Sequence, residues 1–220
     1  MKRKVLGLIH TSAALVPVFQ QLCREKMPGV DVFNIADDSL IKDVIARGEL
    51  TPLTSRRVAD HVLSAEAAGA DFILVTCSSI GRAVEAAALR TSVPVLRVDQ
   101  PMADKAVGLG KRIGVVATLS TTLEPTADLI RRRAQVAGRE VSVVTRLCEG
   151  AFEALMAGDT AKHDAAVTAA LLALAPETDV IVLAQASMAR VAAGLGKLKT
   201  GTPILASPEI AIGHLAAILA

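Results

Sequence analysis

The segment Asp71-Phe-Ile-Leu-Val-Thr-Cys77-Ser-Ser-Ile-Gly-Arg82 joins a short apolar run to small polar residues. An apolar run of this length is typical of a strand that is buried on both faces of a parallel sheet. A second segment, Asp179-Val-Ile-Val-Leu-Ala-Gln185-Ala-Ser-Met-Ala-Arg190, repeats this pattern later in the chain. Cys77 and Gln185 therefore occupy equivalent positions, which indicates a duplicated α/β chain.

The repeat extends beyond these two segments. The shift that places Cys77 on Gln185 also places Ser12 on Ser120 and matches leucine, proline, aspartate and arginine residues. A shared bias toward alanine is the alternative explanation, but it would not give polar matches a common offset. We predict a first half formed by residues 1–97 plus 207–220 and a second half formed by residues 98–206.

Short apolar runs alternate along the chain with longer, alanine-rich amphipathic stretches, as βα units do. We expect strands at residues 5–10, 31–34, 72–76, 95–98, 113–117, 142–145, 180–184 and 204–206. We expect helices at residues 14–24, 53–68, 79–90, 102–109, 122–137, 161–174, 186–194 and 209–219. The predicted fold class is α/β, with two pseudo-symmetric halves, each a mostly parallel four-stranded sheet flanked by helices.

Composition limits the classes of protein and partner. The 220 residues are 52% hydrophobic and 21% charged, which favours a globular protein with a well-buried core. A net charge of +2 and an aromatic content of 2% argue against a nucleic-acid partner. No apolar stretch approaches the roughly 20 residues of a membrane-spanning helix, and no cleavage pattern follows the basic start. We therefore expect a soluble, cytoplasmic protein with no nucleic-acid or membrane partner.

The cysteines and glycines give no sign of a metal or cofactor. Cys23, Cys77 and Cys148 are odd in number and widely spaced, which suits neither a disulfide framework nor a zinc site. We interpret Cys23 and Cys148 as structural. The glycines of residues 108–114 precede a strand, whereas a dinucleotide-binding motif would follow one. No His/Asp/Glu cluster has metal-ligand spacing, so the sequence predicts no cofactor and no metal.

Four predicted strand ends carry small or hydroxyl-bearing residues where a helix begins. They are Thr11 and Ser12, Ser78 and Ser79 after Cys77, Thr118, Ser120 and Thr121, and Ala186 and Ser187 after Gln185. Ligands of open α/β sheets bind outside the carboxyl ends of strands, and backbone N–H groups at helix starts favour an anion. We expect the two halves to place these ends around one cleft. The arrangement suits a small carboxylate substrate and the enolate-like anion that forms when a proton leaves the neighbouring carbon.

Three motifs, together with the two-half layout, carry a resemblance to a known family. They are the Val-Thr-Cys77-Ser-Ser turn, the Ile-Gly-Val-Val-Ala-Thr118 strand and the His10-Thr11-Ser12 start. Over essentially its whole length, the chain resembles the aspartate/glutamate/hydantoin racemase superfamily, which also includes maleate isomerase and arylmalonate decarboxylase. The resemblance implies a cofactor-independent enzyme that forms a homodimer or a larger homo-oligomer. It also implies that the substrate carboxylate is held by Thr118 and by the hydroxyls of Ser78, Ser79, Ser120 and Thr121.

The chain departs from that superfamily at one of its two cysteines. Racemases of the superfamily carry a cysteine at both strand ends, and this chain matches the first at Cys77 but has Gln185 at the second. Glutamine does not titrate, so Gln185 is a candidate catalytic residue only as a hydrogen-bond donor or acceptor, and a symmetrical two-cysteine racemase is excluded. We expect the pKa of Cys77 to fall below about 8.5, because the residue precedes a helix. His10, whose ordinary pKa lies near 6.5, is a candidate second acid/base.

Several reactions stay open at this point. The first is racemisation or isomerisation of an amino acid or hydroxy acid by proton transfer at the α-carbon, with Cys77 as acid/base and His10 as its partner. The second is proton movement on a single face, as in a tautomerisation. The third is a decarboxylation in which Cys77 protonates the carbanion. A non-enzymatic protein that binds a small carboxylate is a further alternative, although such proteins usually hold ligands with aromatic and charged side chains.

Overall fold

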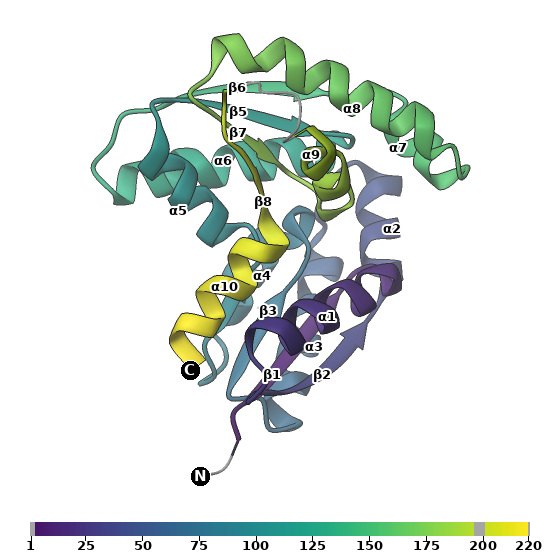
Figure 1. Ribbon diagram of the computed structural model, residues 1–220. Helices are drawn as coiled ribbons and strands as arrows, with labels where there is room; N and C mark the ends of the chain where they lie inside the picture. Colours follow the sequence, from purple (N-terminus) through teal and green to yellow (C-terminus); the bar gives the residue numbers. More distant parts are fainter. Residues whose placement is uncertain (1–2, 196–200, 220) are drawn as a thin grey trace. The chain divides into compact units, whose positions relative to one another are not determined.

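The computed structural model describes residues 3–195 and 201–219 (Figure 1). The chain divides into two compact units, which we call unit 1 (Met1–Asp99 with Pro208–Ala220) and unit 2 (Gln100–Ser207). The predicted boundaries along the chain follow residues 97 and 206. The boundaries of the units follow Asp99 and Ser207.

Unit 1 is built on a four-stranded, all-parallel sheet in the order β2-β1-β3-β4. Its strands are β1 (Val5–His10), β2 (Asp31–Ala36), β3 (Phe72–Val75) and β4 (Val95–Arg97). Its helices are α1 (Val16–Lys26), α2 (Asp38–Arg47), α3 (Pro52–Ala67), α4 (Gly81–Ala88) and α10 (Ser207–Leu219).

Both faces of the unit 1 sheet are buried in apolar cores. Ile9 and Val75 pack with side chains of α2, α3 and α4 on one face. Leu8 and Leu74 pack with side chains of α1 and α10 on the other face. Because successive strand residues point to opposite faces, a sheet covered on both sides needs strands that are apolar throughout.

Unit 2 repeats this arrangement with a four-stranded, all-parallel sheet in the order β6-β5-β7-β8. Its strands are β5 (Arg112–Ala117), β6 (Ser142–Leu147), β7 (Val180–Leu183) and β8 (Ile204–Ala206). Its helices are α5 (Gln100–Leu109), α6 (Ser120–Val136), α7 (Ala151–Met156), α8 (Thr160–Leu174) and α9 (Ala189–Leu195). One face of the sheet packs with α7, α8 and α9, and α5 and α6 also contact the strands. The predicted α/β fold with two four-stranded sheets is confirmed.

Two helices lie outside the predicted ranges, although Asp37-Asp38-Ser39 indicates the start of one of them. The helix α2 begins where Asp37 accepts a hydrogen bond from the N–H of Ser39, so a good N-cap marks its start. The helix α7 has six residues and follows Gly150, which has a φ of 71°. A helix this short does not reveal an apolar period in sequence. Among the described residues, no helix has both the length and the apolar character needed to cross a bilayer.

Strand pairing refines the internal repeat. Gly7 lies opposite Ile73 in unit 1, and Gly114 lies opposite Ile181 in unit 2. The strands β3 and β7 therefore match by the shift that places Cys77 on Gln185, whereas the shift that relates β1 to β5 is shorter by one position. The predicted match of Ser12 to Ser120 was therefore wrong by one position, because the strand register places Ser12 on Leu119. Because β1 and β5 are equally long, the difference arises between the first and third strands of each unit.

Candidate active site

Cys77 lies just beyond the end of β3 and is partly buried. Its backbone is extended, with φ −132° and ψ 121°, and it caps the 3₁₀ turn η2 (Ser78–Ile80). The Thr11 hydroxyl and the backbone N–H groups of Ser79 and Ile80 are the donors that act on the sulfur. The thiol thus lies among donors at the carboxyl edge of the unit 1 sheet, where the sequence predicts it.

The acidity of Cys77 differs from the prediction. Burial raises the pKa of the thiol above its ordinary value, although the hydrogen bonds from Thr11, Ser79 and Ile80 act to lower it. The loss of hydration destabilises the thiolate by more free energy than these donors give back. The negative charge of Asp99 raises the pKa further. The expected lowering was therefore wrong. At neutral pH Cys77 is a protonated thiol, which is the form that can donate a proton.

His10 is the last residue of β1 and is fully buried. Its Nδ1 lies 2.9 Å from Thr76 Oγ1, and its Nε2 lies 3.0 Å from Asn34 Oδ1. Its ring packs at a tilt against Phe19, with 5.6 Å between the ring centroids. Burial lowers the pKa of His10 despite the hydrogen bond with Asn34. These contacts favour a role in holding the strand end, and the role of second acid/base stays a prediction.

Gln185 caps the 3₁₀ turn η4 (Ala186–Met188), with φ −130° and ψ 138°. Its Oε1 accepts hydrogen bonds from the backbone N–H of Thr118 at 2.6 Å and from the Thr118 hydroxyl at 3.0 Å. A backbone N–H can only donate, so the amide atom that faces Thr118 must be the oxygen. The Nε2 group of Gln185 is then left to donate hydrogen bonds in another direction.

The settings of Cys77 and Gln185 are equivalent. The shift that relates β1 to β5 also relates Thr11 to Thr118, and each threonine hydroxyl acts on the side chain of the residue that precedes the turn. The backbone angles at Cys77 and Gln185 are nearly the same. The same backbone arrangement thus carries a titratable thiol in unit 1 and an amide that cannot titrate in unit 2.

The other predicted substrate-binding residues differ in exposure. Thr11, Ser78, Ser79 and Thr118 are buried, Ser12, Thr121 and Ala186 are partly buried, and Ser120 and Ser187 are exposed. Within the part of the chain that the structure describes, the buried Thr121 Oγ1 has no hydrogen-bond partner. A buried hydroxyl without a partner costs roughly 1–3 kcal/mol, so this atom is suited to a polar ligand. The residues that follow β1 and β3 belong to unit 1, and those that follow β5 and β7 belong to unit 2. The single cleft between the halves stays a prediction.

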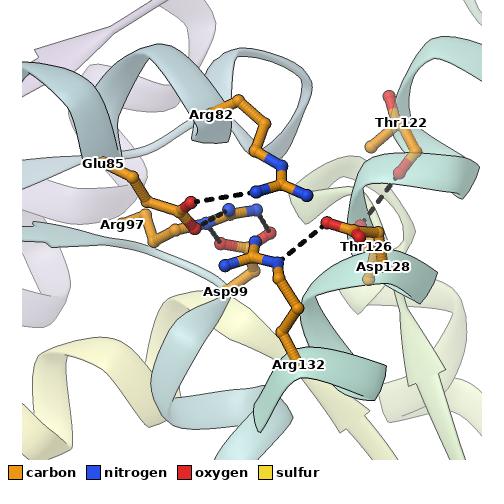
Figure 2. Close-up of polar contacts among 8 residues, drawn as sticks. All are labelled: Arg82, Glu85, Arg97, Asp99, Thr122, Thr126, Asp128 and Arg132. Atoms are coloured by element: carbon orange, nitrogen blue, oxygen red, sulfur yellow. Dashed lines mark hydrogen bonds and ion pairs between the residues drawn. The ribbon is translucent and has the colours of Figure 1, made fainter.

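A buried ion pair that the sequence analysis missed lies at the end of β4. Arg97 donates from Nε and Nη2 to the two carboxylate oxygens of Asp99, at 2.7 and 2.8 Å. Arg97 also donates from Nη1 to Glu85 at 2.6 Å, and Arg82 lies 3.8 Å from the other oxygen of Glu85 (Figure 2). Residues two apart on a strand share a face. The pattern Arg-Val-Asp at residues 97–99, at the end of an apolar run, was the available signal.

A second carboxylate, Asp37, lies at the end of β2. It accepts hydrogen bonds from the Ser39 N–H at 3.1 Å, from Arg57 Nη2 at 2.7 Å and from His61 Nε2 at 2.8 Å. Burial acts to raise the pKa of Asp37, but Ser39, His61 and the charge of Arg57 lower it to about 2. The three partners fix Asp37 as a helix cap. Across residues 3–195 and 201–219, no group of three or more His, Cys, Asp or Glu side chains could hold a metal ion.

Comparisons with known proteins bear on the family and on the fold. The sequence model of the family described as Asp/Glu/Hydantoin racemase matches residues 6–215. The structure of glutamate racemase isoform RacE1 from Bacillus anthracis is similar with a TM-score of 0.72, covering 100% of this chain and 82% of that one at 21% identity. Allantoin racemase from Klebsiella pneumoniae gives a TM-score of 0.73, covering 98% and 87% of the two chains at 16% identity.

Aspartate racemase from Picrophilus torridus gives a TM-score of 0.72, covering 98% of this chain and 92% of that one at 14% identity. At such low identity these likenesses bear on the fold alone, and they confirm it. A search of curated protein sequences finds no significant match.

Proposed function

Because the chain belongs to the Asp/Glu/hydantoin racemase family, we propose that Cys77 transfers the proton in a cofactor-independent reaction at the α-carbon of a small carboxylic acid. Family membership makes the chain a racemase-type isomerase; the catalytic residue and the substrate class are our proposal. The observation that carries it is the setting of the Cys77 sulfur, which lies at a strand end among donors from Thr11, Ser79 and Ile80.

The proposed chemistry needs Cys77 in both protonation states. As a thiol, Cys77 donates its proton to an anionic α-carbon; as a thiolate, it removes the proton from that carbon. A raised pKa makes the thiolate a stronger base but reduces the fraction that carries it at neutral pH. Proton donation is thus the step for which the resting protein is prepared.

Gln185 has a different role in the proposal. Its Oε1 is occupied by Thr118, so its Nε2 donates a hydrogen bond to the negative charge that develops on the substrate. The unpartnered Thr121 hydroxyl, one residue into α6, is proposed to donate to the substrate carboxylate. The proposal keeps the expectation that the two strand ends act on one substrate.

The proposed substrate is a small amino acid, hydroxy acid or related compound with an acidic α-proton. The names of the similar structures point to glutamate, aspartate and allantoin as compounds to try first. The family description adds hydantoins. The scarcity of aromatic side chains, 2% of the chain, favours an aliphatic acid over an aryl one.

Decarboxylation is a second candidate reaction, and two observations favour it. Cys77 is a neutral thiol at rest, and Gln185 cannot act as a base. Loss of carbon dioxide leaves a carbanion that needs one proton donor and no base, so a substituted malonate would suit this site.

The experiment that tests the proposal uses enantiopure acids from these classes, incubated with the protein in heavy water. Proton NMR follows loss of the α-proton signal, polarimetry follows optical purity, and carbon dioxide release is measured in the same samples. Deuterium uptake without carbon dioxide supports proton transfer at the α-carbon, and the optical purity separates racemisation from exchange on a single face. Stoichiometric carbon dioxide supports decarboxylation. Protein alkylated at Cys77 is the blank, and equal turnover by that blank would contradict the proposal.

We further propose that the protein acts in the cytoplasm as a homodimer or larger homo-oligomer, without a nucleic-acid or membrane partner. Light scattering after gel filtration measures the assembly, and a monomeric mass would contradict it.

A further inference from the structure

Cys77 and Asp99 lie just beyond the ends of two neighbouring strands, β3 and β4. Val75 pairs with Arg97 in the register of β3 and β4, and the Val98 N–H donates to Val75 O at 3.0 Å. Neighbouring strands lie about 4.8 Å apart. Two residues beyond that pair, Cys77 follows β3 and Asp99 follows β4. The charge of Asp99 acts on the thiol.

The Arg97 guanidinium packs against the backbone that follows Cys77. A Cβ atom at Gly81 would lie 2.2 Å from Arg97 Cζ, so only glycine admits the guanidinium there. Gly81 directly follows η2, the turn whose N–H groups from Ser79 and Ile80 bind the sulfur. Arg97 therefore supports the turn that fixes the position of the thiol.

Stabilisation of the fold does not by itself explain this buried ion pair. Arg97 is 2% exposed and Asp99 is fully buried, so both charges are desolvated. Apolar side chains of similar size often replace buried ion pairs without loss of stability. The two hydrogen bonds between Arg97 and Asp99, with the third to Glu85, instead give the pair a fixed geometry (Figure 2).

Unit 2 offers an internal comparison. Pairing of Ile73 with Val95 in unit 1 corresponds to pairing of Ile181 with Ile204 in unit 2. By this register Ala206 takes the position of Arg97, and the shift that places Cys77 on Gln185 puts Ala189 at the position of Gly81. The buried pair and its glycine therefore occur in the unit that carries the titratable side chain and not at the equivalent place beside Gln185.

We propose that the Arg97–Asp99 pair is a positioning device for Cys77. Arg97 supports the turn that binds the sulfur, and Asp99 places a negative charge beside it that keeps the proton on the thiol. Both are positioning residues that act through Cys77. The proposal rests on the role of Cys77 in the proposed function.

The test replaces Asp99 by asparagine, which keeps its shape and removes its charge. In D99N we expect the pH midpoint of Cys77 alkylation by iodoacetamide to fall by about one pH unit or more, because a like charge is removed and the positive Arg97 stays. The kcat profile against pH should shift in the same direction. The matched control is E85Q, which removes the other carboxylate bound to Arg97 on the side of α4 and should leave the midpoint unchanged.

A D99N midpoint equal to that of the wild type would overturn the proposal, and so would equal shifts in D99N and E85Q. A shifted midpoint with an unshifted kcat profile would also overturn it, because the pair would then act on the thiol but not on the reaction. If D99N does not fold, the double variant R97M/D99N removes both charges of the buried pair. Its midpoint should still fall, because the negative charge that acts on the thiol is removed in it as well. The proposed function is judged separately, by whether C77A retains activity.

Discussion

The Cys77 sulfur lies among three hydrogen-bond donors and still holds its proton more tightly than a thiol in water. Burial of the thiolate and the nearby Asp99 carboxylate outweigh the Thr11 hydroxyl and the two backbone donors. A sequence argument from helix position alone sees the donors and misses the desolvation, because the depth of a side chain depends on the packing around it. The position of Cys77 was predictable, whereas its acidity was not.

The raised pKa gives a prediction for thiol chemistry. The rate of alkylation of Cys77 should rise with pH to a midpoint above the value of about 8.5 for a free cysteine, because only the thiolate reacts. Mass spectrometry of the peptide that contains Cys77, sampled from pH 6 to pH 10, measures this midpoint. A midpoint below 8.5 would restore the lowered pKa that the sequence suggested.

His10 gives a prediction for stability. Its pKa is lowered in the folded state, so between that pKa and about 6.5 the unfolded chain binds more protons than the folded protein. The free energy of unfolding should therefore fall as the pH drops below about 6.5, and H10Q should lose part of this dependence. Urea unfolding at pH 7.5, 6.5 and 5.5 measures both slopes. Equal slopes for the two proteins would rule His10 out as the source.

At the scale of elements, the alternation of apolar runs and amphipathic stretches was sufficient to predict every strand that the structure describes. The unit 1 sheet is covered on both faces, and the apolar residues of β5 and β7 in unit 2 are all buried. The short helix α7 was not predictable, since six residues show no period. The helices predicted at 79–90 and 186–194 open on the 3₁₀ turns η2 and η4, which the sequence did not distinguish from α-helix. The Arg97–Asp99 pair was also missed, although two opposite charges at the end of an apolar strand were visible in sequence.

The junction between η2 and α4 gives a prediction about packing. Gly81→Ala should destabilise the protein by about 3–5 kcal/mol, because the new Cβ displaces the Arg97 guanidinium and leaves Asp99 buried without its partner. Gly213→Ala in α10 is the matched control, since no atom lies within 4 Å of the Cβ it would add. It should be neutral or stabilise the helix by up to about 1 kcal/mol. Similar unfolding free energies for the two variants would contradict this account of Gly81.

At the scale of the whole molecule, the internal repeat links fold and chemistry. A single shift along the sequence predicted the two sheets and the equivalence of Cys77 and Gln185, and strand pairing then showed that Thr11 corresponds to Thr118. The correction by one position was not available from sequence, because hydrogen-bond register fixes it. The repeat leaves the molecule with one titratable group where the resemblance implies two.

The missing second cysteine gives a prediction for stereochemistry. With a single acid/base on one face, the wild-type protein should exchange the α-proton of its substrate for deuterium and retain most of the optical purity. Gln185→Cys supplies a thiol at the equivalent strand end and should convert this exchange into racemisation. Ser142→Cys, which adds an exposed thiol at the start of β6, is the control. Retention of configuration by Q185C would contradict the expectation that both strand ends act on one substrate.

The central claim is that the Cys77 thiol carries the proton, and deuterium uptake at the α-carbon by C77A measures this most directly. The control is C148A, which removes a buried cysteine just beyond the end of β6, whose pKa burial raises to about 11. With both variants folded by circular dichroism, we expect C77A to lose deuterium uptake by at least a factor of about 100, as expected for loss of an acid/base group, and C148A to retain it. Uptake by C77A at the wild-type rate would contradict the account.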